Sequence, residues 1–141
     1  MNLYLVQHGK AENDSLTEEG LSEVRNVAMF VRSNITVDSI VHSVKRRARE
    51  TAEVLDTILS PTGGITEVEG LKPMDDPEIW MENIDKIESN IMVVGHLPYL
   101  NKLAEDLLHA TIHFKNGGIV CLERDDNWYY HILWAVVPEI V

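Results

Sequence analysis

The stretch Asn2-Leu-Tyr-Leu-Val-Gln-His-Gly9 places a compact apolar run directly before a polar segment. A short continuous apolar run of this kind is typical of a buried strand in a parallel sheet. Because the run stops at Gln7, His8 and Gly9, we expect a strand that ends in a loop carrying these three residues. Ligands of open α/β sheets bind beyond the carboxyl ends of the strands. This strand end is therefore the first candidate for a functional site.

The chain on either side of this stretch alternates between extended and helical patterns. A capping signal within residues 15–20 precedes apolar residues at helical spacing up to Val31, which predicts a helix. We further expect strands at 39–44, 65–68 and 90–94, helices at 46–59, 78–87 and 100–108, and a hairpin formed by 119–122 and 128–137. The alternation predicts an α/β fold, a three-layer α/β/α single domain over residues 1–141. Its central sheet is mostly parallel and ends in a C-terminal antiparallel hairpin.

Length and charge narrow the classes of function. The 141 residues, 45% of them hydrophobic, suffice for one domain with one core. The formal net charge of -11 would repel a nucleic-acid backbone or an anionic membrane, so neither is an expected partner. The apolar run Leu3–Val6 is too short for a signal peptide, and the only cysteine, Cys121, fits a reducing compartment as a buried thiol. These features predict a cytoplasmic protein.

Two further strand ends carry residues suited to an anion. Ser43 is followed by a basic cluster, in which four of the twelve basic residues fall within positions 45–49. The strand at 90–94 ends in Gly95 and His96, which repeats the pattern of the first strand. Since the carboxyl ends of parallel strands meet at one edge of the sheet, we expect these residues to converge with His8 around a small anion.

Four segments resemble one known family, in the order in which that family carries them. Leu3-Tyr-Leu-Val-Gln-His-Gly-Lys-Ala-Glu12 resembles the Arg-His-Gly signature that opens the histidine phosphatases, and Leu16-Thr-Glu-Glu-Gly20 resembles the segment that follows it. Ser43-Val-Lys-Arg-Arg-Ala-Arg-Glu-Thr-Ala52 and Val94-Gly-His-Leu-Pro98 are similar to the arginine segment and to the second histidine motif. The spacing leaves no room for a cap domain, which favours the SixA-like phosphohistidine phosphatases.

The resemblance implies a role for each matched residue. His8 would attack phosphorus and become a transient phosphohistidine, with its other ring nitrogen donating to a backbone carbonyl. Arg47 would present a planar fork to two phosphoryl oxygens, and His96 would hold a third as a charged donor. Gln7, Gly9, Ser43 and Gly95 would line the phosphoryl group. The reaction needs no cofactor and no metal, and the substrate would be a phosphohistidine-containing phosphotransfer protein.

One position departs from the family pattern. Gln7 stands where the opening motif has arginine, so the site lacks a guanidinium there. Losing one charge-assisted contact costs about 1.5 to 3 kcal/mol, or roughly a ten- to hundred-fold reduction in rate, so we expect slowed catalysis. Lys10, Lys45 and Arg46 are candidates for the missing charge, although solvated surface roles fit each of them better.

A general acid for the leaving group is the second gap. Asp75 and Asp76 are the only positional candidates, and both fit better as solvated turn residues. Phosphohistidine has a weaker bond to its leaving group than an alkyl phosphate, so it depends less on a dedicated acid. The missing acid therefore favours a phosphohistidine substrate.

Two other functions remain open. Gln7 is also compatible with a catalytically weakened phosphate-binding or regulatory protein on the same fold, and the matched residues also suit a small-molecule phosphomonoesterase. The spacing of His109 and His113 resembles a helical metal pair, but no acidic residue lies between them. We interpret His42, His131 and the aromatic residues from Trp128 to Trp134 as sheet packing.

Overall fold

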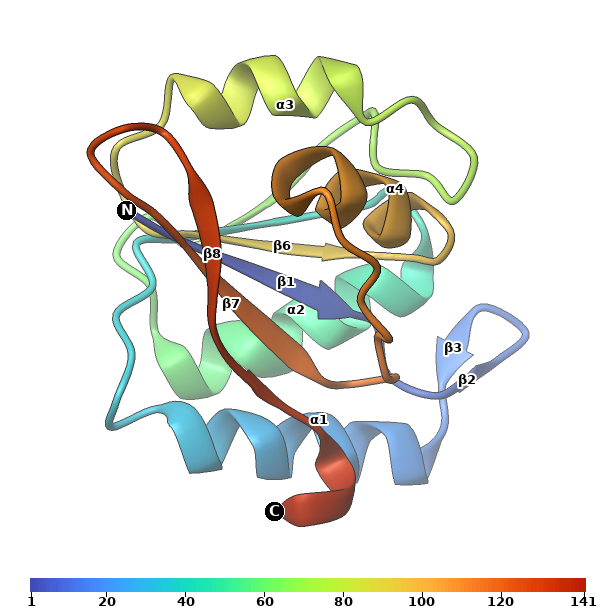
Figure 1. Ribbon diagram of the computed structural model, residues 1–141. Helices are drawn as coiled ribbons and strands as arrows, with labels where there is room; N and C mark the ends of the chain where they lie inside the picture. The colour runs from blue at the N-terminus through green and yellow to red at the C-terminus, as the bar shows by residue number, and fades with distance from the viewer.

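The computed structural model describes residues 1–141 as a six-stranded sheet between two layers of helices (Figure 1). The elements follow in the order β1 (Asn2–Gln7), β2 (Ala11–Glu12), β3 (Ser15–Leu16), α1 (Glu18–Val31), β4 (Ser39–His42), α2 (Arg46–Leu59), β5 (Ile65–Glu67), α3 (Glu78–Asp85), β6 (Ile91–Gly95), α4 (Tyr99–Leu108), β7 (Ile119–Arg124), β8 (Tyr130–Val136) and the 3₁₀ turn η1 (Pro138–Ile140). Helices α1 and α2 cover one face of the sheet, and α3 and α4 cover the other. The predicted α/β/α architecture is confirmed.

The strand order is β5-β4-β6-β1-β7-β8. Strands β5, β4, β6 and β1 are parallel to one another, whereas β7 runs antiparallel to β1 and β8 antiparallel to β7. The mostly parallel sheet with a C-terminal hairpin is therefore confirmed. No helix combines the length and the apolar character that crossing a membrane requires.

The alternation of side chains along β1 divides the core between the two faces of the sheet. Tyr4 and Val6 belong to a cluster of 16 buried residues under α1 and α2, whereas Leu3 and Leu5 belong to a cluster of 15 under α3 and α4. Both clusters meet on β1, which pairs with β6 on one side and with β7 on the other. Because β1 is held on both sides, the position of His8 directly after its carboxyl end is fixed.

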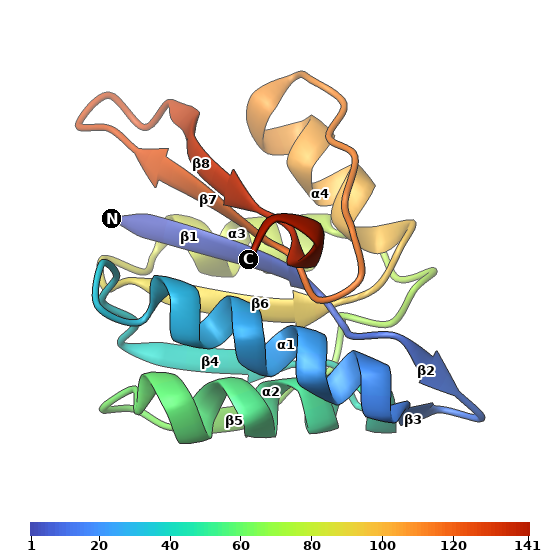
Figure 2. The same ribbon diagram turned by 90° about the horizontal axis from the view of Figure 1, so that it is seen from below.

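The chain contains one small element that the sequence did not predict. Strands β2 and β3 pair antiparallel and form a hairpin beyond the carboxyl end of β1, visible at the right of Figure 1. Residues Asn13 and Asp14 form its turn, with φ of 49° and 62°. These left-handed conformations are favourable for Asn and Asp, which tolerate a positive φ better than other non-glycine residues. Figure 2 shows the hairpin beside the first turn of α1.

The predicted boundaries required small corrections. The second strand ends at His42, two residues before the expected limit, because the chain turns at Ser43 toward the start of α2. In the C-terminal hairpin, β7 extends to Arg124 and β8 begins at Tyr130. Thr17 caps α1 by accepting from the Gly20 amide at 3.0 Å, as the capping signal indicated.

Candidate phosphoryl site

Three strand ends converge at one edge of the sheet, as predicted. The His8 amide donates to the Gly95 carbonyl at 3.1 Å, and the Ser43 amide donates to the Val94 carbonyl at 3.2 Å. The rings of His8 and His96 are tilted against each other with centroids 5.1 Å apart. Residues from β1, β4 and β6 therefore form one cluster, although they lie more than 30 positions apart in the chain.

The imidazole of His8 is held in a single orientation. Its Nδ1 lies 2.8 Å from the Gly9 carbonyl, and its Nε2 lies 3.3 Å from Nε of Arg47. Since a carbonyl can only accept, Nδ1 carries the proton and Nε2 keeps its lone pair. Burial lowers the pKa of His8 below its usual range, the hydrogen bond to Gly9 opposes this, and the Arg47 charge lowers the pKa further. His8 is thus neutral at pH 7, and the lone pair of its Nε2 accepts a hydrogen bond from Arg47.

Arg47, on the first turn of α2, contacts both His8 and a residue that sequence analysis missed. Its Nη1 donates to Oδ1 of Asp14 at 2.7 Å, and Asp14 also accepts from the backbone amides of Arg46 and Arg47 at 3.2 and 3.3 Å. Burial alone would raise the pKa of Asp14, but these hydrogen bonds outweigh it and hold the pKa below its usual value. Asp14 is therefore an ionised carboxylate that binds the arginine.

His96 is 1% exposed and hydrogen-bonds Ser43, with 2.8 Å between its Nε2 and Oγ of Ser43. Burial lowers the pKa of His96 to about 3, and the charge of Arg47 acts in the same direction. The imidazole is therefore neutral at pH 7 in this arrangement. A dianion beside it would raise this pKa, so the charged-donor role stays a prediction that requires a bound phosphoryl group.

Two further polar residues fix the loop that carries His8. Thr51, fully buried in α2, accepts from the Gly9 amide at 3.0 Å and donates to the Arg47 carbonyl at 2.8 Å. Asn116 donates to the His8 carbonyl at 3.0 Å. A Cβ at Gly9 would lie 2.9 Å from a methyl group of Val24, so the loop packs on α1 without room for a side chain. These contacts hold His8 in place relative to Arg47.

Gln7 is buried but engages no partner. Its side chain makes no hydrogen bond, and Oε1 is a buried acceptor without a donor. Gln7 shares the strand face of Leu3 and Leu5, under α3 and α4. The substitution of the motif arginine therefore leaves an amide that takes no part in the contacts between His8, Arg47 and Asp14.

The basic cluster at positions 45–49 carries less free charge than the sequence suggested. Arg46 pairs with Glu50 at 3.3 Å and Arg49 with Glu53 at 3.7 Å, both across one helical turn on the exposed side of α2. Arg47 pairs with Asp14, and Lys10 pairs with Glu19 at 2.8 Å. Lys45 is the one cation of the cluster without an acidic partner, and its charge helps to lower the pKa of His96. The expected basic spot is largely neutralised by these ion pairs.

Asp75 and Asp76 lie in the turn before α3 and cap their own backbone. Asp75 accepts from the Lys72 amide at 2.9 Å, and Asp76 accepts from the Glu78 amide at 3.0 Å. Neither residue is among the charges that shift the pKa of His8 or of His96. They therefore behave as the turn residues that the sequence favoured, and the carboxylate in contact with the site is Asp14.

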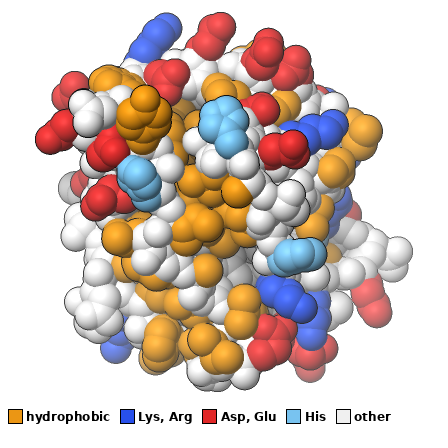
Figure 3. All heavy atoms as spheres, viewed as in Figure 1, with side chains coloured by type: hydrophobic (Ala, Val, Ile, Leu, Met, Phe, Trp, Pro, Cys, Tyr) orange, Lys and Arg blue, Asp and Glu red, His pale blue; other side chains and the backbone are white.

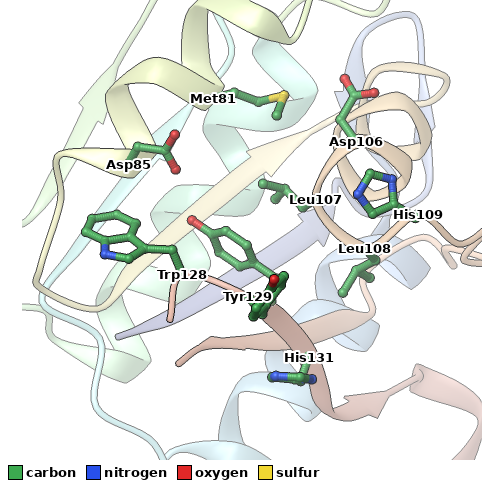
Figure 4. Close-up of a pocket in the computed structure, with 10 residues that line it drawn as sticks. Met81, Asp85, Asp106, Leu107, Leu108, His109, Trp128, Tyr129 and His131 are labelled. Carbon is green, nitrogen blue, oxygen red and sulfur yellow. The ribbon is translucent and has the colours of Figure 1, made fainter. Parts of the chain in front are cut away.

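The largest surface hollow lies away from these residues. It has a volume of about 400 Å³ and is lined by the ends of α3 and α4 and by the turn of the β7–β8 hairpin (Figure 4). The guanidinium of Arg124 in β7 donates to the carbonyl oxygens of Ile84 in α3 and of Ile87 just after it. It lies 3.9 Å from the ring centroid of Trp128, one of the residues that line the hollow. Because the Arg124 amide binds the Met1 carbonyl, this groove lies at the end of the sheet opposite to His8. Figure 3 shows hydrophobic side chains gathered on this face of the molecule.

Not every packing prediction was correct. His42 is 3% exposed and bonds the Ser43 carbonyl, as expected for a packed histidine. His131, by contrast, is exposed and lies 2.8 Å from Asp125. Trp128 and Tyr129 are 52% and 68% exposed, because the hairpin turn projects past the helices. His109 ends α4 with φ of 55°, so it and His113 do not share a helical turn.

Comparison with solved structures extends the resemblance to the whole fold. The protein histidine phosphatase SixA in complex with tungstate superposes with a TM-score of 0.90 at 20% identity, covering 98% of this chain and 97% of the other. A protein from Agrobacterium tumefaciens assigned as the phosphohistidine phosphatase SixA gives 0.80 at 22% identity, with 97% of each chain covered. A phosphoserine phosphatase from Entamoeba histolytica gives 0.75 at 16% identity over 95% of each chain.

Comparison by sequence finds neither a matching family model nor a matching curated protein. The structural matches span nearly the full length of both partners, which shows that this chain shares the fold of the small SixA structures. The same fold carries a phosphoserine phosphatase, so it does not by itself select a substrate.

Proposed function

We propose that the chain is a phosphatase that forms a covalent intermediate on His8 and acts on protein phosphohistidine. The observation that carries this proposal is the orientation of His8, whose Nε2 keeps a lone pair while Nδ1 is bound to the Gly9 carbonyl. A neutral, oriented imidazole meets the requirement for attack on phosphorus. The SixA-like fold supports the same chemistry.

The reaction takes place in two displacements. Nε2 of His8 attacks phosphorus, the bond from phosphorus to the leaving nitrogen breaks, and that nitrogen leaves with the electron pair and takes a proton from solvent. Water then attacks the phosphohistidine, releasing phosphate and restoring neutral His8. Arg47 and His96 lie beside Nε2, where they can stabilise charge on the phosphoryl oxygens.

The substrate class follows from the acids around the site. Asp14 is ionised and bound to Arg47, and Asp75 and Asp76 cap their own turn, so no carboxyl group beside His8 is ready to protonate a leaving oxygen. A phosphoramidate needs less protonation assistance than an alkyl phosphate. Phosphohistidine on a phosphotransfer protein therefore fits better than a phosphomonoester.

The direct test uses a phosphoramidate and a phosphohistidine-bearing protein as donors. We expect phosphate release and an acid-labile, base-stable label on His8, both lost in His8→Asn. The matched control is His131→Asn, which replaces an exposed histidine at the other end of the sheet. A wild-type protein that neither hydrolyses nor becomes labelled by either donor would disprove the proposal, and faster turnover of phosphomonoesters would assign the small-molecule alternative.

The pH dependence of this reaction has a definite sign. Attack requires neutral His8, and burial lowers its pKa below the ordinary value of about 6.5. We therefore expect kcat/KM to stay constant from pH 8 to below 6.5 and to fall only in more acidic solution. A pH–rate profile with stable substrate analogues checks this, and an acid limb centred above 6.5 would contradict it.

One observation favours a second candidate function. The Gln7 amide makes no hydrogen bond to Arg47 or His8, and Arg47 is paired with Asp14, which suits a protein that binds phosphate and turns it over slowly. Gln7→Arg separates the two: we expect roughly a ten- to hundred-fold gain in rate if the site is degenerate. Unchanged, robust turnover would reject the regulatory function.

A further inference from the structure

We propose that Asp14 restrains Arg47, so that a phosphoryl group must displace this carboxylate before Arg47 can bind it through both arms of its fork. The inference rests on the proposed phosphoryl site and names a residue that sets its affinity for anions. Asp14 belongs to the β2–β3 hairpin, outside every motif that pointed to the site.

The contacts of Arg47 show why a displacement is needed. Nη1 donates to Asp14 at 2.7 Å and Nε donates to Nε2 of His8 at 3.3 Å. The nitrogen that must attack phosphorus is therefore engaged by the group that must bind the phosphoryl oxygens. A guanidinium has two forks, Nε with Nη2 and Nη1 with Nη2, and here Nε is engaged by His8 and Nη1 by Asp14, so neither fork is fully free while both contacts persist.

The charges around the site also indicate that Asp14 weakens anion binding. Asp14 cancels the charge of Arg47, Gln7 brings none, and the two histidines are neutral. The remaining charged groups beside them are Lys45, Arg46 and Glu50, of which the last two form an ion pair. An arriving dianion thus meets a site with little net positive charge, and the carboxylate of Asp14 opposes its approach.

The environment of Asp14 permits two substitutions that remove its charge. Asn accepts backbone hydrogen bonds as Asp does and tolerates the left-handed φ of 62°. Asn has one acceptor oxygen, so Asp14→Asn removes the charge and keeps the hydrogen bond to one of the two amides of Arg46 and Arg47, which bind different oxygens of Asp14. Asp14→Gly tolerates the same φ and removes the whole side chain, so it serves as a second variant if the first folds poorly.

Affinity for orthovanadate, measured by titration against the intrinsic tryptophan fluorescence or by calorimetry, tests the proposal without turnover. We expect Asp14→Asn to bind vanadate about five- to twenty-fold more tightly than wild type, a range that allows for the partial exposure of the pair. The matched control is Glu12→Gln, which removes one charge from the same hairpin at a residue that makes no ion pair. Its affinity should change by less than about twofold.

Two results would overturn the proposal. Equal or weaker binding by both Asp14 variants would make Asp14 a positioning residue that keeps Arg47 productive. An equal gain in Glu12→Gln would assign the effect to the overall charge. Because vanadate binding needs no hydrolysis, a gain in Asp14→Asn would stand even if phosphohistidine were not a substrate, so the two proposals fail separately.

Discussion

His96 is a residue whose neutrality is built into the fold. It is 1% exposed, its Nε2 is bound to Ser43, and its Nδ1 is buried without a partner. Burial lowers its pKa to about 3, against about 6.5 in an unfolded chain. The unfolded state therefore binds a proton below pH 6.5 that the folded state does not, so stability must fall as the pH falls through this range.

We predict that His96→Gln removes this part of the acid sensitivity. From pH 7.5 to 5.5, protonation of His96 in the unfolded chain should cost the wild type about 1.4 kcal/mol of unfolding free energy. Gln cannot titrate but can still bond Ser43. Urea denaturation of both proteins at the two pH values measures the difference, and parallel losses of stability would refute the neutral assignment.

Some residues of the candidate site can be predicted from short sequence motifs, and others only from contacts in the folded chain. His8, Arg47 and His96 stand in ordered motifs at strand ends, so the sequence predicted them as site residues, and the structure brings them together. Asp14 acts through a contact with Arg47, 33 positions away, and lies in no motif. Thr51 stands in the arginine segment, but its contact with Gly9 joins segments 42 positions apart, so the sequence did not predict its role. The ion pairs that neutralise the basic cluster are a different case, because Glu50 and Glu53 stand four residues after Arg46 and Arg49 and the spacing itself indicates both pairs.

The β2–β3 hairpin is the element that connects the site to α1. Glu50 of α2 accepts from the Leu16 amide at 2.8 Å and from Oγ of Ser15 at 3.1 Å, which fastens the hairpin to the helix that carries Arg47. On the other side, the Thr17 amide donates to the Lys10 carbonyl at 3.0 Å. A Cβ at Gly20 would collide with that same carbonyl.

We predict that Gly20→Ala destabilises the protein by about 1 to 3 kcal/mol, since the backbone at Lys10 would have to move. Helix propensity alone predicts the opposite sign, a gain of up to about 1 kcal/mol. Thermal or urea denaturation decides between the two effects. Ser22→Ala, at an exposed position on the same helix, is the control and should leave stability unchanged or slightly higher.

Elements long enough to show an apolar run or a hydrophobic periodicity were predicted well, whereas the two-residue strands were not. The parallel strands and the four helices follow from apolar runs and helical spacing, whereas β2 and β3 contain two residues each and bury only one side chain between them, that of Leu16. A hairpin of that size has no periodicity to detect, because its stability comes from tertiary contacts such as those of Glu50.

The net charge of the whole molecule repels the anions that the candidate site would bind. Its formal net charge is -11, and the local cations are mostly paired. Such a field slows the association of a small anion at low salt and is screened as the Debye length shortens from about 30 Å at 0.01 M to about 8 Å at 0.15 M ionic strength.

We therefore predict that kcat/KM for a small phosphoramidate rises about two- to threefold when sodium chloride is raised over this range. The reaction after binding takes place away from the bulk field, so kcat should stay nearly constant. Steady-state kinetics at several salt concentrations measure both quantities. A steady fall in kcat/KM with salt would show that local cations such as Lys45 outweigh the net charge.

Cys121 gives the molecule a practical property. The thiol is fully covered in β7, and burial raises its pKa to about 12, so it stays protonated and out of reach of alkylating reagents in the folded state. A cysteine introduced at a chosen surface position would then be the single reactive thiol of the chain. Fluorophores or spin labels on the β2–β3 turn could report its movement during anion binding without removal of any native residue.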